Sequence, residues 1–446
     1  MIQFIASSWP RNRINMDCPA CSKQNTENDQ FCRECGTSLG MPANNNVEVA
    51  RDRSTRYHGL DALRGIAMLL GIVLHAALPY MPNVELWWPV DDRVSPLIST
   101  IFEFIHMWRM PVFFILAGFF ANLLVSRRSW KSWWGNRLLR IGLPIVVFWP
   151  LMSLTLPSIF SYGRTGDLIF FYSDAGQPHH LWFLWQLLIF TILTVLFTPL
   201  HLLGMGIANL LRQSGLGVIT NISNKVKSLA STLLFRTRFP FVFIILACVI
   251  NLPTGGELIL NPIGSGLYFA IGYSLYGNTS LFLFLKSYWR YYFVAGIIGF
   301  TLYTILHVIS MNFTANIYSN ETARALGIEN ETTELLALSG YLLKMICSVL
   351  FSYAFIGLAE SKFGSYNAKL RFISDGAYWM YLIHLPLVTF ITFSMFNLSI
   401  PIEMKFIIAI VTTSIFCLTT YKYFVRSTPI GILLNGRRYP FKATRN

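Results

Sequence analysis

Ten apolar runs, most of them long enough to cross a bilayer, constrain this chain more than any other feature. About 20 apolar residues cross the hydrocarbon core as an α-helix, and a backbone inside lipid must satisfy its own hydrogen bonds. Hydrophobic residues make up 54% of the chain and charged residues 13%, which excludes an ordinary soluble domain. We therefore predict an all-α, polytopic membrane bundle of about ten transmembrane helices. The runs lie at 60–81, 97–125, 139–160, 181–203, 239–253, 258–278, 291–311, 335–358, 376–397 and 402–425.

Basic residues at the ends of these runs predict the orientation. One alternate set of connections holds about twenty Lys and Arg against one acid, Glu360, whereas the other set holds three Arg against about ten acids. The positive-inside rule then places both termini in the cytoplasm. The formal charge of +14 is thus interpreted as membrane orientation with contacts to lipid head groups, and no nucleic-acid partner is expected.

The first run carries two ionisable side chains in apolar surroundings. Arg64 and His75 lie eleven residues apart, so both are predicted on one helix face, about 16 Å apart along the axis. Ionisable groups at membrane depth are costly and usually face a protein interior or a water-filled path. This face is the first candidate site, and Asp61, one turn before Arg64, is expected to hold the guanidinium.

A second polar stripe is predicted on the outer half of the second run. Glu103, His106 and Arg109 recur every third residue and therefore share a helix face. A histidine such as His106 can also be a simple hydrogen-bonding residue between helices. We expect the stripe to support the acceptor side of a tunnel.

Further candidates follow along the chain. Arg137 and Arg140 belong to a basic hairpin that can anchor anionic lipids, and their guanidinium groups can also grip a phosphorylated ligand. His180 opens the fourth run, and Tyr381 and His384 lie in the ninth.

Two Cys-x-x-Cys motifs precede the first run, formed by Cys18, Cys21, Cys32 and Cys35. Four thiolates at this spacing predict a tetrahedral structural zinc, without which so short a segment has too little core to fold. A disulfide-stapled tail is the alternative, and a reducing cytoplasm argues against it. The predicted organisation is a disordered or non-native start (1–15), a zinc ribbon (16–40), a linker (41–56), the membrane domain (57–425) and a basic cytoplasmic tail (426–446).

Together these residues resemble the membrane-bound acyltransferase-3 superfamily, and within it the branch that succinylates periplasmic glucans. One departure is Ala117, where many members have a serine before Gly118, and the zinc ribbon is an addition to the family pattern. The resemblance covers residues 57–425 and rests on Leu60-Asp61-x-x-Arg64-Gly65 with His75, Phe104-Ile-His106, Arg109-Met-x-Val-Phe-Phe114, Ala117-Gly118-Phe119, Arg137-x-x-Arg140, His180-Leu-Trp-Phe-Leu184 and Tyr381-Leu-Ile-His384-x-Pro386.

The resemblance implies an O-acyltransferase of the bacterial inner membrane. An acyl group, succinyl or acetyl, would pass from a cytoplasmic acyl-CoA donor to a hydroxyl of an envelope glycan or another exported acceptor. By resemblance, His75 is the catalytic histidine, Arg64 is the matching basic residue, and Arg137 and Arg140 lie near the donor. The zinc ribbon is expected to be a structural head or to recruit a partner protein.

The chemistry agrees with an imidazole at the centre of the site. A sugar hydroxyl is a poor nucleophile, and its attack on a thioester needs a base whose pKa lies near the working pH. Whether His75 is that base or carries the acyl group itself stays open. A proton-coupled transporter or exporter is the alternative function, because intramembrane Arg, His and Glu also describe a carrier.

Overall fold

The computed structural model describes residues 15–17, 24–26, 57–126, 130–173, 179–213, 239–276, 278–319 and 328–435, with isolated helical positions between 225 and 234. The chain divides into two units, residues 1–55 and 56–446. In the first unit, β1 (Asn15–Asp17) pairs antiparallel with β2 (Gln24–Thr26). Cys18, Cys21, Cys32 and Cys35 lie outside the described residues, so the zinc ribbon stays a prediction.

The described part of the second unit consists of helices and their connections. Each apolar run of the sequence contains one helix, so the all-α prediction is confirmed for this unit. The α-helices are α1 (His58–Ala77), α2 (Pro96–Val125), α3 (Trp130–Arg137), α4 (Leu143–Thr165), α5 (Trp182–Gln213), α7 (Phe241–Asn251), α8 (Pro262–Leu275), α9 (Thr279–Ser319), α11 (Ile328–Lys362), α12 (Ala368–Ser394), α13 (Ile402–Thr420) and α14 (Pro429–Asn435). Shorter 3-10 or π turns are η1 (Leu78–Tyr80), η2 (Leu138–Gly142), η3 (His179–Leu181), η4 (Leu252–Thr254) and η5 (Tyr421–Val425).

Seven helical segments in the described residues are long and apolar enough to cross a membrane, so ten full crossings are not confirmed. Two further apolar helices, His179–Thr194 and Phe241–Thr254, are shorter. The seven segments are His58–Tyr80, Pro96–Val125, Ser132–Thr165, Ser280–Asn312, Thr332–Lys362, Ala368–Ser394 and Ile402–Val425.

The helices α7 and α8 are too short to cross the bilayer singly. With 11 and 14 residues, they extend about 16 and 21 Å, against a hydrocarbon core of about 30 Å. The turn between them meets α2 at His106, about 15 Å from the start of that helix. The two helices contact each other as a short helical hairpin, and neither belongs to the seven segments that can cross a membrane.

A second departure from regular crossings lies between α4 and α5. The chain after α4 runs back along that helix, because the Phe171 amide donates to Ser158 Oγ at 3.1 Å and the Ser173 amide to the Ser153 carbonyl at 3.0 Å. Ser153 Oγ also lies 3.3 Å from His179 Nε2. As a result, η3 and the start of α5 lie beside the middle of α4 rather than at its end.

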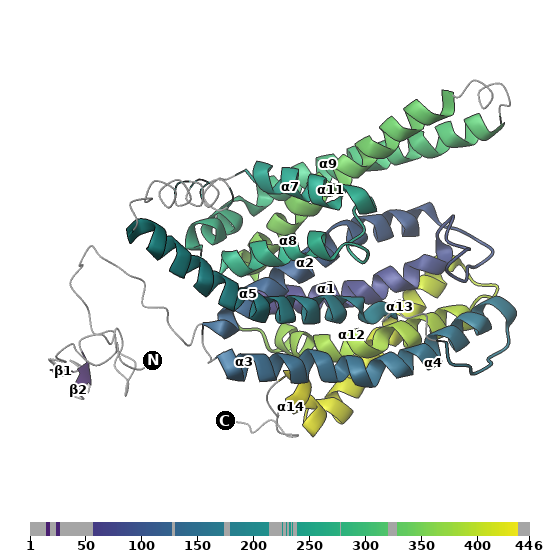
Figure 1. Cartoon of the computed structure of the whole chain (residues 1–446). Helices are drawn as coiled ribbons and strands as arrows, with labels where there is room; N and C mark the ends of the chain where they lie inside the picture. The colour runs from purple at the N-terminus through teal and green to yellow at the C-terminus, as the bar shows by residue number, and fades with distance from the viewer. Residues whose placement is uncertain are drawn as a thin grey trace. The chain divides into compact units, whose positions relative to one another are not determined.

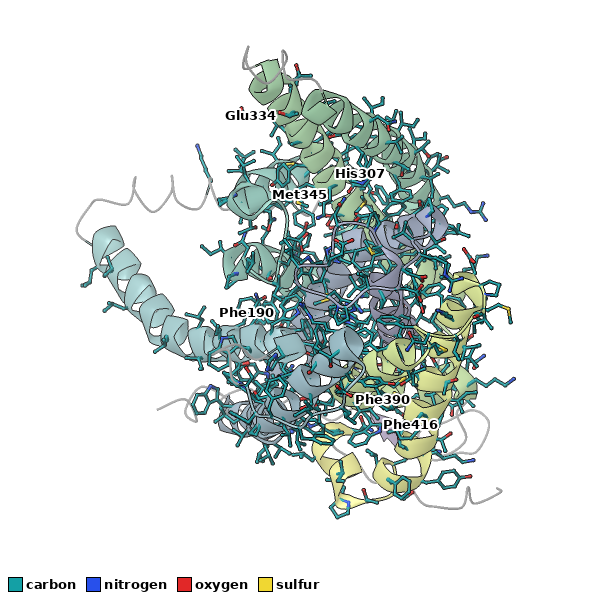
Figure 2. The ribbon with its side chains drawn as sticks, turned by 90° about the vertical axis from the view of Figure 1, so that its right-hand side faces the viewer. Phe190, His307, Glu334, Met345, Phe390 and Phe416 are labelled. Carbon is teal, nitrogen blue, oxygen red and sulfur yellow. The ribbon has the colours of Figure 1, made fainter. Side chains whose placement is uncertain are left out.

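The helix α1 lies at the centre of the bundle, in contact with α2, α11, α12 and α13 (Figure 1). The helices α9 and α11 run side by side (Figure 1). Large apolar side chains such as Phe390 and Phe416, 40% and 49% exposed, cover the outside of α12 and α13 (Figure 2). A membrane domain of this kind exposes apolar surface to lipid while its polar groups face the interior.

A buried ion pair fixes the connection between η1 and α2. Lys405 on α13 donates to Asp91 Oδ2 at 2.6 Å, and both side chains are 0% exposed. Removing one partner of such a pair costs about 3–5 kcal/mol, because the other charge stays buried and uncompensated. We therefore expect Asp91→Asn to lower the thermal unfolding midpoint of the detergent-solubilised protein clearly.

The neighbouring residue supplies a matched control. Asp92 is 82% exposed and pairs with Arg93 at 3.3 Å, so Asp92→Asn should leave the unfolding midpoint nearly unchanged. Equal midpoints for the two variants would contradict a stabilising role for the buried pair.

Candidate active site

Three imidazole rings from three elements converge inside the bundle. His75, near the end of α1, has its ring centroid 5.3 Å from that of His384 on α12. His180, in η3, lies 5.7 Å from His384 by the same measure. Trp88, from the connection between η1 and α2, stacks on His75 at 6.3 Å and 14°. The ring of His75 therefore faces other protein groups and not the lipid. We call His75, His180 and His384 the histidine cluster.

One backbone carbonyl orients two of these rings. The Tyr381 carbonyl accepts from His180 Nε2 at 3.1 Å and from His384 Nδ1 at 2.9 Å. His384 Nδ1 also donates to the Met380 carbonyl at 2.9 Å, and the Tyr381 hydroxyl donates to the His180 carbonyl at 2.6 Å. A neutral imidazole carries one proton, so these bonds leave a lone pair on His180 Nδ1 and on His384 Nε2.

The remaining ring nitrogens of the cluster are open. Within the described part of the chain, His75 Nδ1, His180 Nδ1 and His384 Nε2 are buried and have no hydrogen-bond partner. Each such atom costs about 1–3 kcal/mol relative to a satisfied one. Three of them close together mark a place where a polar ligand or substrate can bind.

Arg109 supplies the positive charge of this region. The side chain is 8% exposed, and its Nη1 lies 2.2 Å from the position that a Cβ on Gly71 would occupy. The guanidinium therefore packs directly on α1, one turn before His75. It acts electrostatically on both His75 and His384. Arg109, one of the residues singled out in the sequence, therefore lies beside the histidine cluster.

Arg64 lies in a different environment. It pairs with Asp61 at 3.2 Å, as expected, and donates to Ser374 Oγ at 3.0 Å. Asp61 also pairs with Arg371 at 2.9 Å, and Arg371 donates to Asp375 at 2.9 Å. This ion network joins the start of α1 to the start of α12. The eleven residues between Arg64 and His75 separate the network from the histidine cluster by about 16 Å of helix.

The stripe predicted on α2 splits between several partners. Glu103 accepts a hydrogen bond from the Tyr303 hydroxyl at 3.0 Å. His106 pairs with Glu257, in the turn of the α7–α8 hairpin, at 3.2 Å, and Glu257 pairs with Lys344 on α11 at 2.7 Å. Of these three residues, Arg109 is the one whose side chain packs on α1, the helix that carries His75.

A hollow at the other end of α2 contains Arg137. It lies between α2, α3, α5 and α8 and is open to the outside, and its volume of about 400 Å³ includes that open space. Apolar side chains such as Ala117 and Phe190 line most of it, and Arg137 and Trp133 also line it, with the guanidinium 5.9 Å from the indole ring. Figure 2 shows α5 continuing beyond Phe190, away from the other helices. The Arg140 carbonyl accepts a hydrogen bond from Tyr378, which ties η2 to α12.

Several polar residues of these networks were not predicted. Lys344 is the single charged residue of the run 335–358, and Glu257 is the single charged residue between 239 and 285, so both carried a signal in the sequence. Arg371 and Asp375 lie four apart on one helix face. Trp88 carried no comparable signal, because an outer loop is an ordinary place for an interfacial tryptophan.

Comparison with known proteins places these residues in a family. The family model described as an acyltransferase domain matches residues 57–422. Glucans biosynthesis protein C of Escherichia coli K12 is 34% identical over 155 residues, which cover 31% of this chain and 38% of the relative. The protein of the same name from Shigella dysenteriae serotype 1 is 35% identical over 150 residues, with the same coverage.

The matched part therefore spans 38% of the length of these relatives. No solved structure matches the chain. The family match includes the histidine cluster, Arg64, Arg109 and Arg137, and it extends over most of the chain. The chain belongs to the acyltransferase-3 family.

Proposed function

We propose that the chain is an integral membrane O-acyltransferase. It moves a succinyl or acetyl group from a cytoplasmic acyl-CoA donor to a hydroxyl of an envelope glycan or another exported acceptor. The observation that carries this proposal is the histidine cluster, whose open ring nitrogens lie beside Arg109 inside the membrane bundle. The relatives named glucans biosynthesis protein C favour a glucan as the acceptor.

The residues of the cluster suit acyl transfer to an alcohol. An imidazole takes the hydroxyl proton, and the oxygen attacks the thioester carbonyl. Negative charge then develops on the carbonyl oxygen, and a buried guanidinium such as Arg109 stabilises it. The C–S bond breaks, and the donor leaves as the free thiol after it takes the proton back. Arg64 acts at a distance in this proposal, because its contacts are with Asp61 and Ser374.

The basic segments support a donor that arrives from the cytoplasm of a bacterial inner membrane. Positive residues concentrate in one alternate set of connections and in the C-terminal tail. Arg137, which lines the hollow between α2 and α5, belongs to this set. We propose that the phosphates of the donor bind at Arg137 and that its acyl arm enters the hollow.

The test is an acyl-transfer assay with purified full-length protein in lipid nanodiscs. Succinyl-CoA or acetyl-CoA is supplied together with periplasmic glucan. The released thiol is measured, and the mass of the glucan is determined by mass spectrometry. We expect thiol release that depends on glucan, with a mass gain of one acyl group. Glucan or proton flux in proteoliposomes without donor consumption would instead identify a transporter.

The donor site leads to a prediction for Arg137. A charge-assisted hydrogen bond is worth about 1.5–3 kcal/mol, so Arg137→Gln should raise the KM for acyl-CoA about tenfold or more and change kcat little. Arg164→Gln is the matched control, because Arg164 is exposed at the opposite end of α4. Equal KM values for both variants would contradict a donor site at Arg137.

We further propose that Cys18, Cys21, Cys32 and Cys35 hold one structural zinc ion. Purified protein should then contain about one zinc per chain, measured by atomic emission, as expected for a four-thiolate site. The double variant Cys18→Ser, Cys21→Ser should lose the metal and keep acyl transfer, since the candidate site lies in the membrane unit. Wild-type protein without zinc would contradict the proposal. Whether the ribbon recruits a partner protein is tested by affinity purification with the same variant as control.

A further inference from the structure

We propose that His384, and not only His75, is a catalytic residue: its Nε2 takes the proton from the acceptor hydroxyl, which binds between the two rings. This inference rests on the proposed acyl transfer and names the base in it. It follows from the hydrogen bonds of His384, which leave a single possible role for its second nitrogen.

The ring of His384 is held in one orientation and one tautomer. Its Nδ1 donates to the carbonyls of Met380 and Tyr381, both at 2.9 Å. Turning the ring over would lose both bonds and leave a buried carbonyl without one of its donors. Nε2 therefore presents a lone pair, and the group must act as an acceptor in its neutral form.

That lone pair has no partner within the described structure. His384 is 1% exposed, so neither lipid nor bulk solvent can supply a donor readily. The other two helices and the turn packed against it contribute His75, Arg109 and His180, and its own helix contributes Tyr381. Among these neighbours, Arg109 carries a fixed positive charge, and the others are neutral in their ordinary forms at neutral pH.

The facing ring supplies the second contact for a substrate hydroxyl. His75 Nδ1 is also buried and open, its ring centroid lies 5.3 Å from that of His384, and the two rings do not hydrogen bond to each other. In this proposal one hydroxyl oxygen binds between them, with its proton directed at His384 Nε2 and its oxygen held by His75. A small polar group in this position would satisfy both open nitrogens.

The proton transfers then balance over one turnover. The hydroxyl O–H bond breaks, and its proton moves to His384 Nε2. The oxygen forms a C–O bond with the thioester carbonyl carbon, the C–S bond breaks, and its electron pair leaves on sulfur. The His384 imidazolium returns the proton to the thiolate, which leaves as the thiol. Ester and free thiol are the products, and His384 is neutral again.

Two variants of His384 test this role. His384→Asn places an amide N–H where Nδ1 stands and so keeps a donor for the two carbonyls, but it removes Nε2. His384→Gln places an amide near the Nε2 position, where it can hydrogen bond but cannot accept a proton at neutral pH. Both should lower kcat by about 10²–10⁴-fold, the usual contribution of a general base, with a KM for the donor within about threefold of wild type.

The matched control is Thr389→Val, on the same helix. Thr389 is 1% exposed and hydrogen bonds within α12 to the Leu385 carbonyl at 2.8 Å, away from the cluster. Its kcat should stay within about threefold of wild type. Size-exclusion profiles and thermal unfolding in detergent show whether each variant is folded.

A pH profile separates a base from a structural residue. The acidic limb of log kcat/KM for the wild type reports protonation of the base, so the residual activity of His384→Asn should lack that limb. Folded His384→Asn and His384→Gln proteins with wild-type kcat and an unchanged profile would overturn this inference alone, and His75 would then be the base. A wild-type protein that consumes no acyl donor would overturn the inference together with the proposed function.

Discussion

We expect His75→Ala to lower acyl transfer by about 10²-fold or more, because the imidazole that holds the reacting hydroxyl in position is lost. The ring lies 5.3 Å from His384 and stacks on Trp88, so its removal leaves a gap where the hydroxyl should be held. The remaining residues of α1 keep the helix apolar, and membrane insertion should be unaffected. Thiol release and glucan mass give the activity, and membrane fractionation gives the insertion.

The same helix provides the control. His58, at the opposite end of α1, makes an edge contact with Tyr366 at 5.7 Å and takes no part in the cluster. His58→Ala should therefore keep activity within about threefold of wild type. If His75→Ala turned over normally, the catalytic assignment of His75 would be wrong, and equal losses in both variants would indicate damage to α1 itself.

One further measurement decides between the two roles that the sequence left open for His75. Incubation of the protein with a labelled donor and no acceptor, followed by peptide mass spectrometry, shows whether an acyl group becomes attached to His75. We expect no adduct, because His75 binds the hydroxyl in the arrangement inferred above. A stable adduct on His75 would identify it as an acyl carrier.

The helices were predictable because each apolar run is a strong and local signal. All ten runs contain a helix, and α1, α2, α4, α9, α11, α12 and α13 belong to the segments that can cross a membrane. The count of ten crossings is not confirmed at the runs of α5, α7 and α8, because none of the seven crossing segments covers them. Glu257, in the turn between α7 and α8, meets His106 and Lys344 from distant parts of the chain, and a hydropathy pattern does not report such contacts.

The sequence predicted which residues belong to the candidate site better than it predicted which of them lie close together. His75, Arg109, His180, Tyr381 and His384 were each singled out, and the structure brings them together. Spacing along one helix favoured Arg64 as the partner of His75, yet Arg64 contacts Ser374, 310 residues away in sequence. Contacts of this range depend on how α1 packs on α12, which no local pattern reports.

The ion network and the histidine cluster share the same two helices. Asp61 and Arg64 on α1 meet Ser374 and Arg371 on α12 at one level, and His75 meets His384 at another. Because both helices are stiff, the network fixes the register in which the two imidazoles face each other. In the proposed function Arg64 is therefore a positioning residue, which acts on the reaction through the placement of His75.

Arg109 leads to the second large expected effect. Arg109→Met should lower kcat by about 10²–10³-fold, the loss seen when one stabilising group for a developing oxyanion is removed. The guanidinium is buried on Gly71, one turn from His75, and lies in electrostatic range of both His75 and His384. The KM for the donor should change little, because the charge that Arg109 stabilises forms only in the transition state.

Gly71→Ala tests the position of that charge without removing it. The added Cβ would lie 2.2 Å from Arg109 Nη1, so the guanidinium must move away. Gly340→Ala is the control, since a Cβ there meets no atom within 4 Å. We expect a reduced kcat for Gly71→Ala alone, and thermal unfolding in detergent shows that both variants are folded. If both alanine variants and Arg109→Met kept the wild-type kcat, Arg109 would be a packing residue and the oxyanion would need another donor.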